Sequence, residues 1–367
     1  NTSGVAVAVG DCDGDGHQDL VYLRKNRLAD SAEGAKLYVF SNRADGTVGY
    51  DTPQEIDLGN DIEGLDLAVA DIDGDGLLNI VALVRDPLET GPQLFYWETL
   101  AANSCTVGVA STPTAIFGDM KKIGFGRFDA NNTLDLAVVG TETWVGTVCT
   151  TFSADKYTCG GSISTIAIAG FDGTSVHAAD ITGNGQHEIV VSDYAGVNRV
   201  YTFNFPVFEL TSKQFGGTST TGLAFGDLNG DGDLDIVECN ELSPDHVLST
   251  ATLTDHWVAA AAEATRACAV GDMDGDGDLD LVRAVGDGPW EIRISKGLGT
   301  AYNKLGDGSV YGPVGATINS VRWGDFDNDG DKDLLVARTS NSFATVLIND
   351  GSMDFSAPNI ITQTGAG

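Results

Sequence analysis

The chain has 367 residues, 47 of them glycine, and a formal net charge of −33 from 53 acidic against 20 basic residues. A surface this acidic repels the phosphates of nucleic acids and of anionic lipids, so we expect no nucleic-acid partner. Membrane insertion is not expected either, because no apolar run approaches the roughly 20 residues of a spanning helix. The charge instead favours calcium and neutral or basic partners.

One acidic stretch recurs seven times, and its fullest form is DMDGDGDLD, from Asp272 to Asp280. The glycine at its sixth position permits a sharp turn that a residue with a Cβ would resist. The seven copies start at Asp11, Asp71, Arg127, Asp180, Asp227, Asp272 and Asp325. Their spacing of about fifty residues suits a four-stranded propeller blade and is too long for a nonapeptide calcium solenoid.

Each copy is flanked by short apolar runs rich in β-branched residues, such as VAVAVG at 5–10, so each loop joins two predicted strands. A third strand follows in each repeat, for example KLYVFSN at 36–42, and then a turn and a more polar fourth strand. An EF-hand would need helical flanks and Glu at the twelfth loop position, where Tyr22, Ala82 and Arg283 stand in three copies. The EF-hand and dockerin interpretations therefore fail.

This pattern of strand, D-x-D-x-D-G-x-x-D loop and strand resembles the FG-GAP/VCBS repeat of integrin α-subunit heads and of Psathyrella-type fungal lectins. The resemblance covers essentially the whole chain. It implies an all-β fold, a seven-bladed β-propeller of four-stranded antiparallel blades, with calcium-binding loops between first and second strands. We expect a single domain over residues 1–367 that closes into a ring, because the residues after Asp325 and before Asp11 together make one repeat.

Alternate carboxylates on a tight loop converge on one point, and calcium takes about 6–8 oxygen ligands. We predict about five calcium (Ca²⁺) sites, each formed by the first, third, fifth and ninth side chains of a loop. The predicted ligands are Asp11, Asp13, Asp15 and Asp19; Asp71, Asp73, Asp75 and Asn79; Asp227, Asn229, Asp231 and Asp235; Asp272, Asp274, Asp276 and Asp280; and Asp325, Asp327, Asp329 and Asp333.

Two loops depart from this pattern. In the third, Arg127 replaces the first acid and can itself neutralise Asp129 and Asp135, so we expect no calcium there. The fourth loop carries only two formal charges and is predicted to bind calcium weakly or not at all. Its candidate ligands are Asp180, Thr182, Asn184 and Glu188.

The residue after the first acid is apolar in every copy and is predicted to plug the core, which makes Cys12 a buried side chain. Trp323 lies two residues before its loop and is likewise predicted to pack in the core.

The six cysteines permit disulfides and fit an extracellular setting. Cys149 and Cys159 flank a short strand–turn–strand segment and are predicted to pair. The pairs Cys239–Cys268 and Cys12–Cys105 are weaker alternatives. The chain starts at Asn1, not Met, and so resembles the mature form of a secreted or cell-surface protein.

No catalytic motif such as G-x-S-x-G or H-E-x-x-H is present, which disfavours an enzyme. The first hypothesis is a secreted, calcium-stabilised binding propeller, lectin-like (carbohydrate-binding) or adhesive, whose partner is a glycan or an extracellular protein. The alternatives are a polysaccharide lyase or hydrolase on a propeller, and a structural subunit of an extracellular assembly. Tryptophans that could stack on sugars, or could instead fill gaps between blades, are Trp97, Trp144, Trp257 and Trp290. The oligomeric state stays open.

Overall fold

The computed structural model describes residues 4–24, 34–42, 53–72, 75–89, 92–101, 104–108, 114–115, 119–128, 134–141, 145–148, 152–153, 158–159, 164–166, 172–204, 207–217, 219–260, 262–286, 291–297, 309–311, 318–338, 344–351, 353, 355 and 357–361. Over these residues the secondary structure is all strand, and no described helix has the length and hydrophobicity needed to span a bilayer. Seven four-stranded antiparallel sheets and two two-stranded sheets form within the described part.

The strands of the first three large sheets are as follows. The first contains β1 (Gly4–Gly10), β2 (Asp19–Arg24), β3 (Lys36–Phe40) and β4 (Gln54–Asp57). The second contains β5 (Glu63–Ala70), β6 (Asn79–Arg85), β7 (Pro92–Trp97) and β10 (Thr114–Ala115), with β8 (Thr99–Ala101) and β9 (Ser104–Val107) as a separate hairpin. The third contains β11 (Asp119–Gly126), β12 (Asp135–Thr141), β13 (Val145–Val148) and β16 (Ser164–Ile166), with β14 (Phe152–Ser153) and β15 (Thr158–Cys159) as a second hairpin.

The other four large sheets have no such insertions among the described residues. The fourth contains β17 (Gly173–Ala179), β18 (Glu188–Asp193), β19 (Asn198–Asn204) and β20 (Val207–Phe215). The fifth contains β21 (Thr220–Gly226), β22 (Asp235–Asn240), β23 (His246–Ser249) and β24 (Asp255–Val258). The sixth contains β25 (Thr265–Gly271), β26 (Asp280–Val285), β27 (Glu291–Ser295) and β28 (Ser309–Tyr311). The seventh contains β29 (Ile318–Gly324), β30 (Asp333–Arg338), β31 (Ala344–Ile348) and β32 (Ala357–Ile361).

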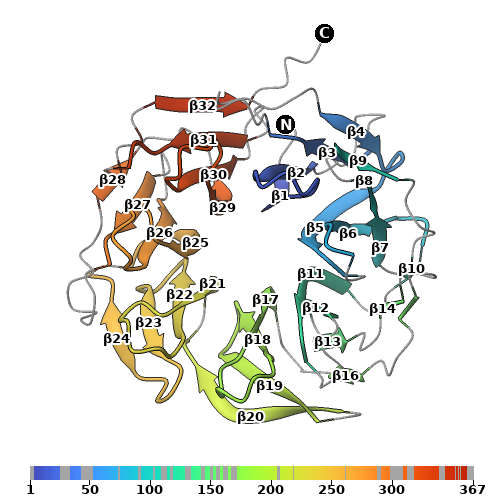
Figure 1. Ribbon diagram of the computed structural model, residues 1–367. Coiled ribbons are helices and arrows are strands. Elements are labelled where there is room, and N and C mark those ends of the chain that lie inside the picture. The colour runs from blue at the N-terminus through green and yellow to red at the C-terminus, as the bar shows by residue number, and fades with distance from the viewer. Residues whose placement is uncertain are drawn as a thin grey trace.

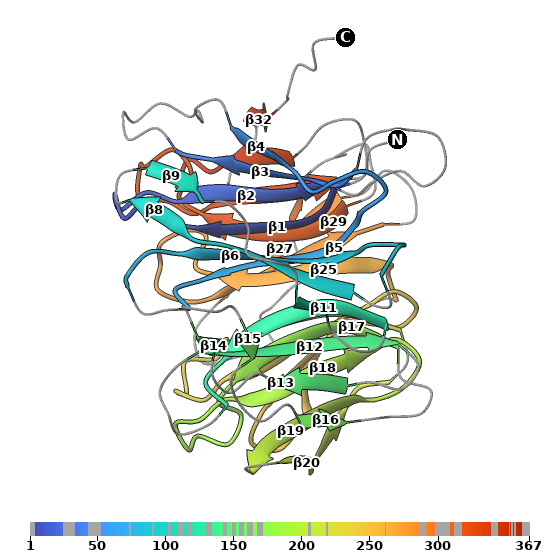
Figure 2. The ribbon, with the colours of Figure 1, turned by 90° about the vertical axis from the view of Figure 1, so that its right-hand side faces the viewer.

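The large sheets follow one another around a ring, with the first strand of each sheet nearest the axis (Figure 1). This is the architecture of a β-propeller. Viewed from the side, the strands run across the thickness of the ring, so the loops that join them lie on its two faces (Figure 2). Each acidic loop follows the innermost strand of its sheet and precedes the second strand, as predicted, so the described parts of these loops lie on one face.

The core lies between the sheets rather than at the axis. Each of seven clusters of buried apolar residues joins two neighbouring sheets. One of these clusters packs Val7 and Tyr22 of the first sheet against Phe326 and Leu335 of the seventh. The first and last sheets are therefore neighbours, and every sheet buries both faces, as ring closure requires.

Candidate metal centres

The acidic loops share one backbone geometry, which the glycine at the sixth position allows. That glycine has a positive φ of 84° to 99° in every loop but the third, whose sixth residue is Asn132. Its amide donates a hydrogen bond to the first acid, as from Gly16 to Asp11 Oδ2 at 2.9 Å and from Gly330 to Asp325 Oδ2 at 3.0 Å. The loop is therefore a tight turn that directs alternate side chains toward its centre.

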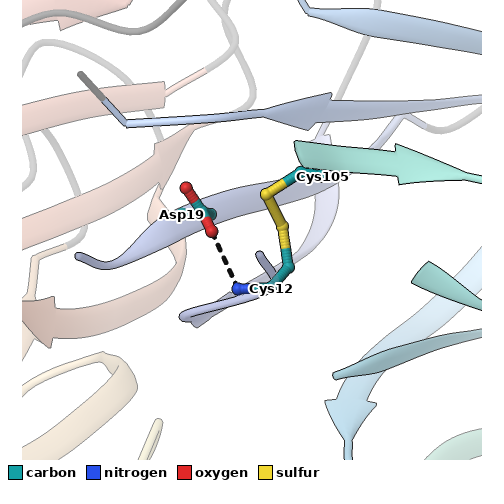
Figure 3. A group of neighbouring side chains, drawn as sticks. All are labelled: Cys12, Asp19 and Cys105. Carbon is teal, nitrogen blue, oxygen red and sulfur yellow. Dashed lines mark hydrogen bonds between the residues drawn. A yellow bond between two sulfur atoms is a disulfide. The ribbon is translucent and has the colours of Figure 1, made fainter. Parts of the chain in front are cut away.

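The second and ninth loop residues attach this turn to the core. The second residue is buried in all seven loops, which confirms the predicted plug: Cys12, Ile72, Phe128, Ile181, Leu228, Met273 and Phe326. Its amide donates to the side chain of the ninth residue in every copy, as from Cys12 to Asp19 Oδ2 at 2.8 Å (Figure 3) and from Phe326 to Asp333 Oδ2 at 2.7 Å. The ninth residue thus holds the loop closed, a role that its spacing did not reveal, and its ligation of calcium stays a prediction.

The first, third and fifth side chains come together in the most acidic loops. One carboxylate oxygen from each lies within 4.8 Å of the other two in three described loops. These sets are Asp11, Asp13 and Asp15; Asp272, Asp274 and Asp276; and Asp325, Asp327 and Asp329. In the second loop Asp73 lies outside the described residues, while Asp71 and Asp75 take the same turn geometry.

The fifth loop has an amide at its third position. Asn229 donates from Nδ2 to Asp231 Oδ2 at 2.9 Å, which brings the third and fifth side chains together. The amide of Asp231 in turn donates to Asp227 Oδ1 at 3.1 Å. An amide takes the place of one carboxylate here, so the predicted calcium ligands of this loop carry one negative charge fewer.

In these loops, neighbouring carboxylates repel one another and disfavour each other's charged form. Burial, and then the neighbouring Asp15, raise the pKa of Asp13, and burial and Asp329 do the same to the pKa of Asp327. Burial is also the main cause that raises the pKa of Asp333, to about 7. Hydrogen bonds from two backbone N–H groups lower this pKa only in part, and the neighbouring loop acids raise it further. A bound cation would favour the charged form of every one of these groups.

Two further observations test whether a cation fits. Asp274 Oδ1 and Asp325 Oδ1 are buried, and among the described residues no donor reaches either atom. The other oxygen of Asp274 accepts from the Lys296 ammonium, which outweighs burial and lowers the pKa of Asp274. Donor sets made only of carboxylate and amide oxygens suit a hard divalent ion such as calcium, so the residues fit.

In the fourth loop, both carboxylate oxygens of Glu188 accept hydrogen bonds from groups of the same loop. The Thr182 hydroxyl donates to Glu188 Oε1 at 2.9 Å, and the amides of Ile181 and Thr182 donate to Glu188 Oε2. The longer Glu side chain reaches groups that Asp does not bond in the other loops. A weak or empty calcium site remains the prediction here.

The third loop can be followed only in part. Asp129 and Asn131 lie outside the described residues, so the predicted contact of Arg127 with Asp129 is not tested. Asp135 accepts from the amide of Phe128 at 2.8 Å, as the ninth residue does elsewhere. The backbone of Arg127 also bonds His187 of the fourth loop, whose amide donates to the Arg127 carbonyl at 2.9 Å. Neighbouring loops are thus connected, which the sequence of the fourth loop did not by itself reveal.

Of the two alternatives for the tryptophans, packing between blades holds for the two that can be checked. Trp97 is only 1% exposed and packs in the core between the first and second sheets. Trp257 is 8% exposed and lies beneath the buried Arg283 guanidinium, 5.1 Å from its ring centroid. Both rings fill space between sheets and cannot stack on a sugar. Trp144 and Trp290 lie outside the described residues.

The prediction that Trp323 packs in the core is wrong, because this side chain is 37% exposed. Its indole lies over Gly271 of the sixth sheet, where an added Cβ would be 3.1 Å from the ring, and Lys332 Nζ is 5.3 Å from its centroid. Only a glycine at this neighbouring position leaves room for so large a ring. The side chain therefore packs against Gly271 and stays partly exposed.

Two disulfides are present in the described part of the chain. Cys12–Cys105 joins the first loop to β9, with the Cα atoms 5.4 Å apart, and lies beside Asp19 (Figure 3). Cys239–Cys268 joins the fifth and sixth sheets. Both weaker alternatives from the sequence are thus confirmed, whereas the favoured pair falls on Cys149, outside the described residues.

Comparisons with known proteins agree with this fold. The protein structures most similar to the chain include BBS1N in complex with ARL6DN, soaked with mercury, at 13% identity and a TM-score of 0.60, covering 100% of this chain and 94% of BBS1N. Raptor from Chaetomium thermophilum matches at 12% identity and a TM-score of 0.58, over 93% of this chain and 28% of Raptor. No curated protein sequence matches. Identities this low show a shared fold alone.

A family model for the FG-GAP-like repeat matches residues 11–82, 180–238 and 272–336, together more than half of the chain. Each matched segment starts at the first residue of an acidic loop and holds two loops. The third loop, where Arg127 replaces the first acid, lies outside all three segments. The chain belongs to the family of FG-GAP-like repeat proteins.

Proposed function

We propose that this chain is a calcium-stabilised, seven-bladed propeller that serves as an extracellular binding module. The observation that carries the calcium proposal is the gathering of three carboxylates within 4.8 Å of one another, repeated in three described loops. The first, second, fifth, sixth and seventh loops would each hold one ion through the residues predicted above. The ion would supply the positive charge that holds each loop together.

Calorimetric titration of calcium into the metal-free protein tests this proposal. We expect about five binding events, and Asp272→Asn should remove one of them. Asp180→Asn is the matched control, because Asp180 and Asp272 occupy the same loop position and each accepts from the sixth-position glycine. Absence of calcium binding at millimolar concentration overturns the proposal.

An extracellular setting is supported by the two disulfides and by the acidic surface. A binding role is supported by the fold, since BBS1N, which shares it, was crystallised in complex with ARL6DN. The partner class is an extracellular protein or a glycan. Burial of Trp97 and Trp257 removes two sugar platforms, so a glycan would have to rely on loop oxygens and on other aromatic residues.

Binding of the labelled protein to cells, with and without calcium, separates the two partner classes. Loss of binding after glycosidase treatment of the cells identifies a glycan, and loss after protease treatment alone identifies a protein. A glycan array then names the sugar. Failure to bind any cell surface or glycan in calcium overturns the binding role, while leaving the calcium sites to their own test.

A further inference from the structure

The sixth acidic loop differs from the first and the seventh in a basic side chain that lies beside it. Lys296 directly follows β27, and its Nζ lies 2.5 Å from Asp274 Oδ2. Asp274 is the third residue of the loop and one of the three acids whose oxygens lie within 4.8 Å of one another. The lysine is exposed and Asp274 is mostly buried, so the ammonium reaches from solvent to the edge of the predicted calcium site.

The strand register holds Lys296 at this loop. Leu281, directly after the ninth loop residue Asp280, pairs with Ser295 of β27. The amide of Gly297 donates to Asp280 Oδ1 at 2.7 Å. Lys296 lies between these two backbone contacts, so the sheet itself places the ammonium within reach of the loop acids.

The equivalent positions of the first and seventh sheets carry uncharged residues. There the amides of Asn42 and Asn349 each donate to the ninth loop acid at 2.8 Å, as in the sixth sheet. The residues before them, Ser41 and Ile348, therefore correspond to Lys296. Among the described residues, no lysine or arginine lies within ion-pair distance of the predicted calcium ligands of these two loops. The ammonium thus distinguishes the sixth loop from two loops of the same geometry.

The ammonium and a calcium ion would act on the same negative charges. The sixth loop carries five aspartates at alternate positions, Asp272, Asp274, Asp276, Asp278 and Asp280. In the metal-free loop the ammonium is attracted to these carboxylates, whereas beside a bound divalent cation it is repelled. The two effects are one coupling free energy, so the stabilisation that the lysine gives the metal-free loop is subtracted from the affinity for calcium.

We propose that Lys296 is a tethered cation that competes with calcium at the sixth loop, because it stabilises the metal-free loop and lowers its affinity for the ion. This inference rests on the proposed calcium site and names the residue that regulates it. Five acids without a lysine would bind calcium more tightly. Lys296 therefore moves the half-saturation of this loop toward the roughly 10⁻⁴–10⁻³ M of extracellular calcium modules.

Hydrogen exchange of the full chain, followed by mass spectrometry during a calcium titration, tests the proposal loop by loop. In the sixth loop the amides of Gly275 and Gly277 donate to Asp272, so the peptide that contains them reports this loop. Lys296→Gln should lower the calcium concentration for half-protection of this peptide about three- to tenfold. In chelator, the same variant should exchange faster than the wild type, because the five acids then lack their cation.

Three further variants separate charge from structure. Lys296→Arg keeps the positive charge and should behave as the wild type. Lys36→Gln is the matched control, since Lys36 also pairs with an acid at 2.5 Å, Glu55 on the outer strand of the first sheet, and it should leave the sixth loop unchanged. Ser41→Lys places an ammonium at the corresponding position of the first loop and should raise the calcium concentration for half-protection of that loop.

Two outcomes overturn the proposal while the first and seventh loops still respond to calcium. One is an unchanged sixth loop in Lys296→Gln, both in the titration and in chelator. The other is weaker calcium binding in that variant, which would show that the lysine positions Asp274 for the ion. If no loop responds to calcium, the proposed function fails and this inference fails with it, and the response of the first and seventh loops distinguishes these cases.

Discussion

Removal of calcium should lower the thermal stability of the whole ring. In three described loops, three acids lie within reach of one another, and burial and mutual repulsion raise the pKa values of Asp13 and Asp327. An ion that binds only the folded state removes this repulsion and stabilises the fold by mass action. The perturbation is therefore an excess of chelator.

The size of the effect follows from the number of loops. Extracellular calcium modules bind with dissociation constants of about 10⁻⁴–10⁻³ M, so at about 2 mM free calcium each site adds roughly 1–2 kcal/mol. About five such loops add about 5–10 kcal/mol. At about 2 °C per kcal/mol for a chain of this length, chelation should lower the melting temperature by roughly 10–20 °C.

Differential scanning calorimetry in calcium and in chelator measures this shift. Asp272→Asn should reduce the calcium-dependent shift by about a fifth, whereas Asp180→Asn should leave it unchanged, because we predict a weak or empty fourth loop. Each variant replaces a carboxylate that accepts a hydrogen bond from a loop glycine with an amide, so the difference between them reports calcium. A melting temperature that is identical with and without chelator refutes the reasoning.

Three other predictions concern the loops, the disulfide and the axis. Asp333→Ala leaves two buried N–H groups without an acceptor and should cost about 2–4 kcal/mol in urea unfolding, more than Asp333→Asn; equal costs would contradict the loop-closing role. Replacing Cys12 and Cys105 by serine opens a bridge of sequence separation 93 and should cost about 4–5 kcal/mol in the chain-entropy model; a cost near zero would show that the bridge is dispensable. His177 has a pKa of about 4 in the folded protein, against 6.5 for a free imidazole, so its neutral form contributes fully to folding stability above pH 6.5. This contribution is lost as the pH falls toward 4. The free energy of unfolding of His177→Gln, measured by urea unfolding, should therefore fall less over this pH range than that of the wild type, and an equal fall would contradict the prediction.

The sequence by itself determined the repeat, the position of each acidic loop and the strands on either side. These features are local: Asp and Gly at fixed offsets force a turn, and alternating apolar residues specify the strands that the turn joins. The plug residue after the first acid was also predictable, because one apolar side chain between two polar ones must face the core. Even ring closure followed from counting residues to a full repeat.

Only the tertiary structure decided which side chains are available for binding. Trp97 and Trp323 both belong to apolar strand ends, yet one is covered by a neighbouring sheet and the other lies over a glycine of the sixth sheet. The pairing of Cys12 with Cys105 and the approach of Lys122 to Asp66 likewise join residues of different repeats. Such contacts depend on how adjacent sheets turn toward each other around the axis, and no local pattern encodes that geometry.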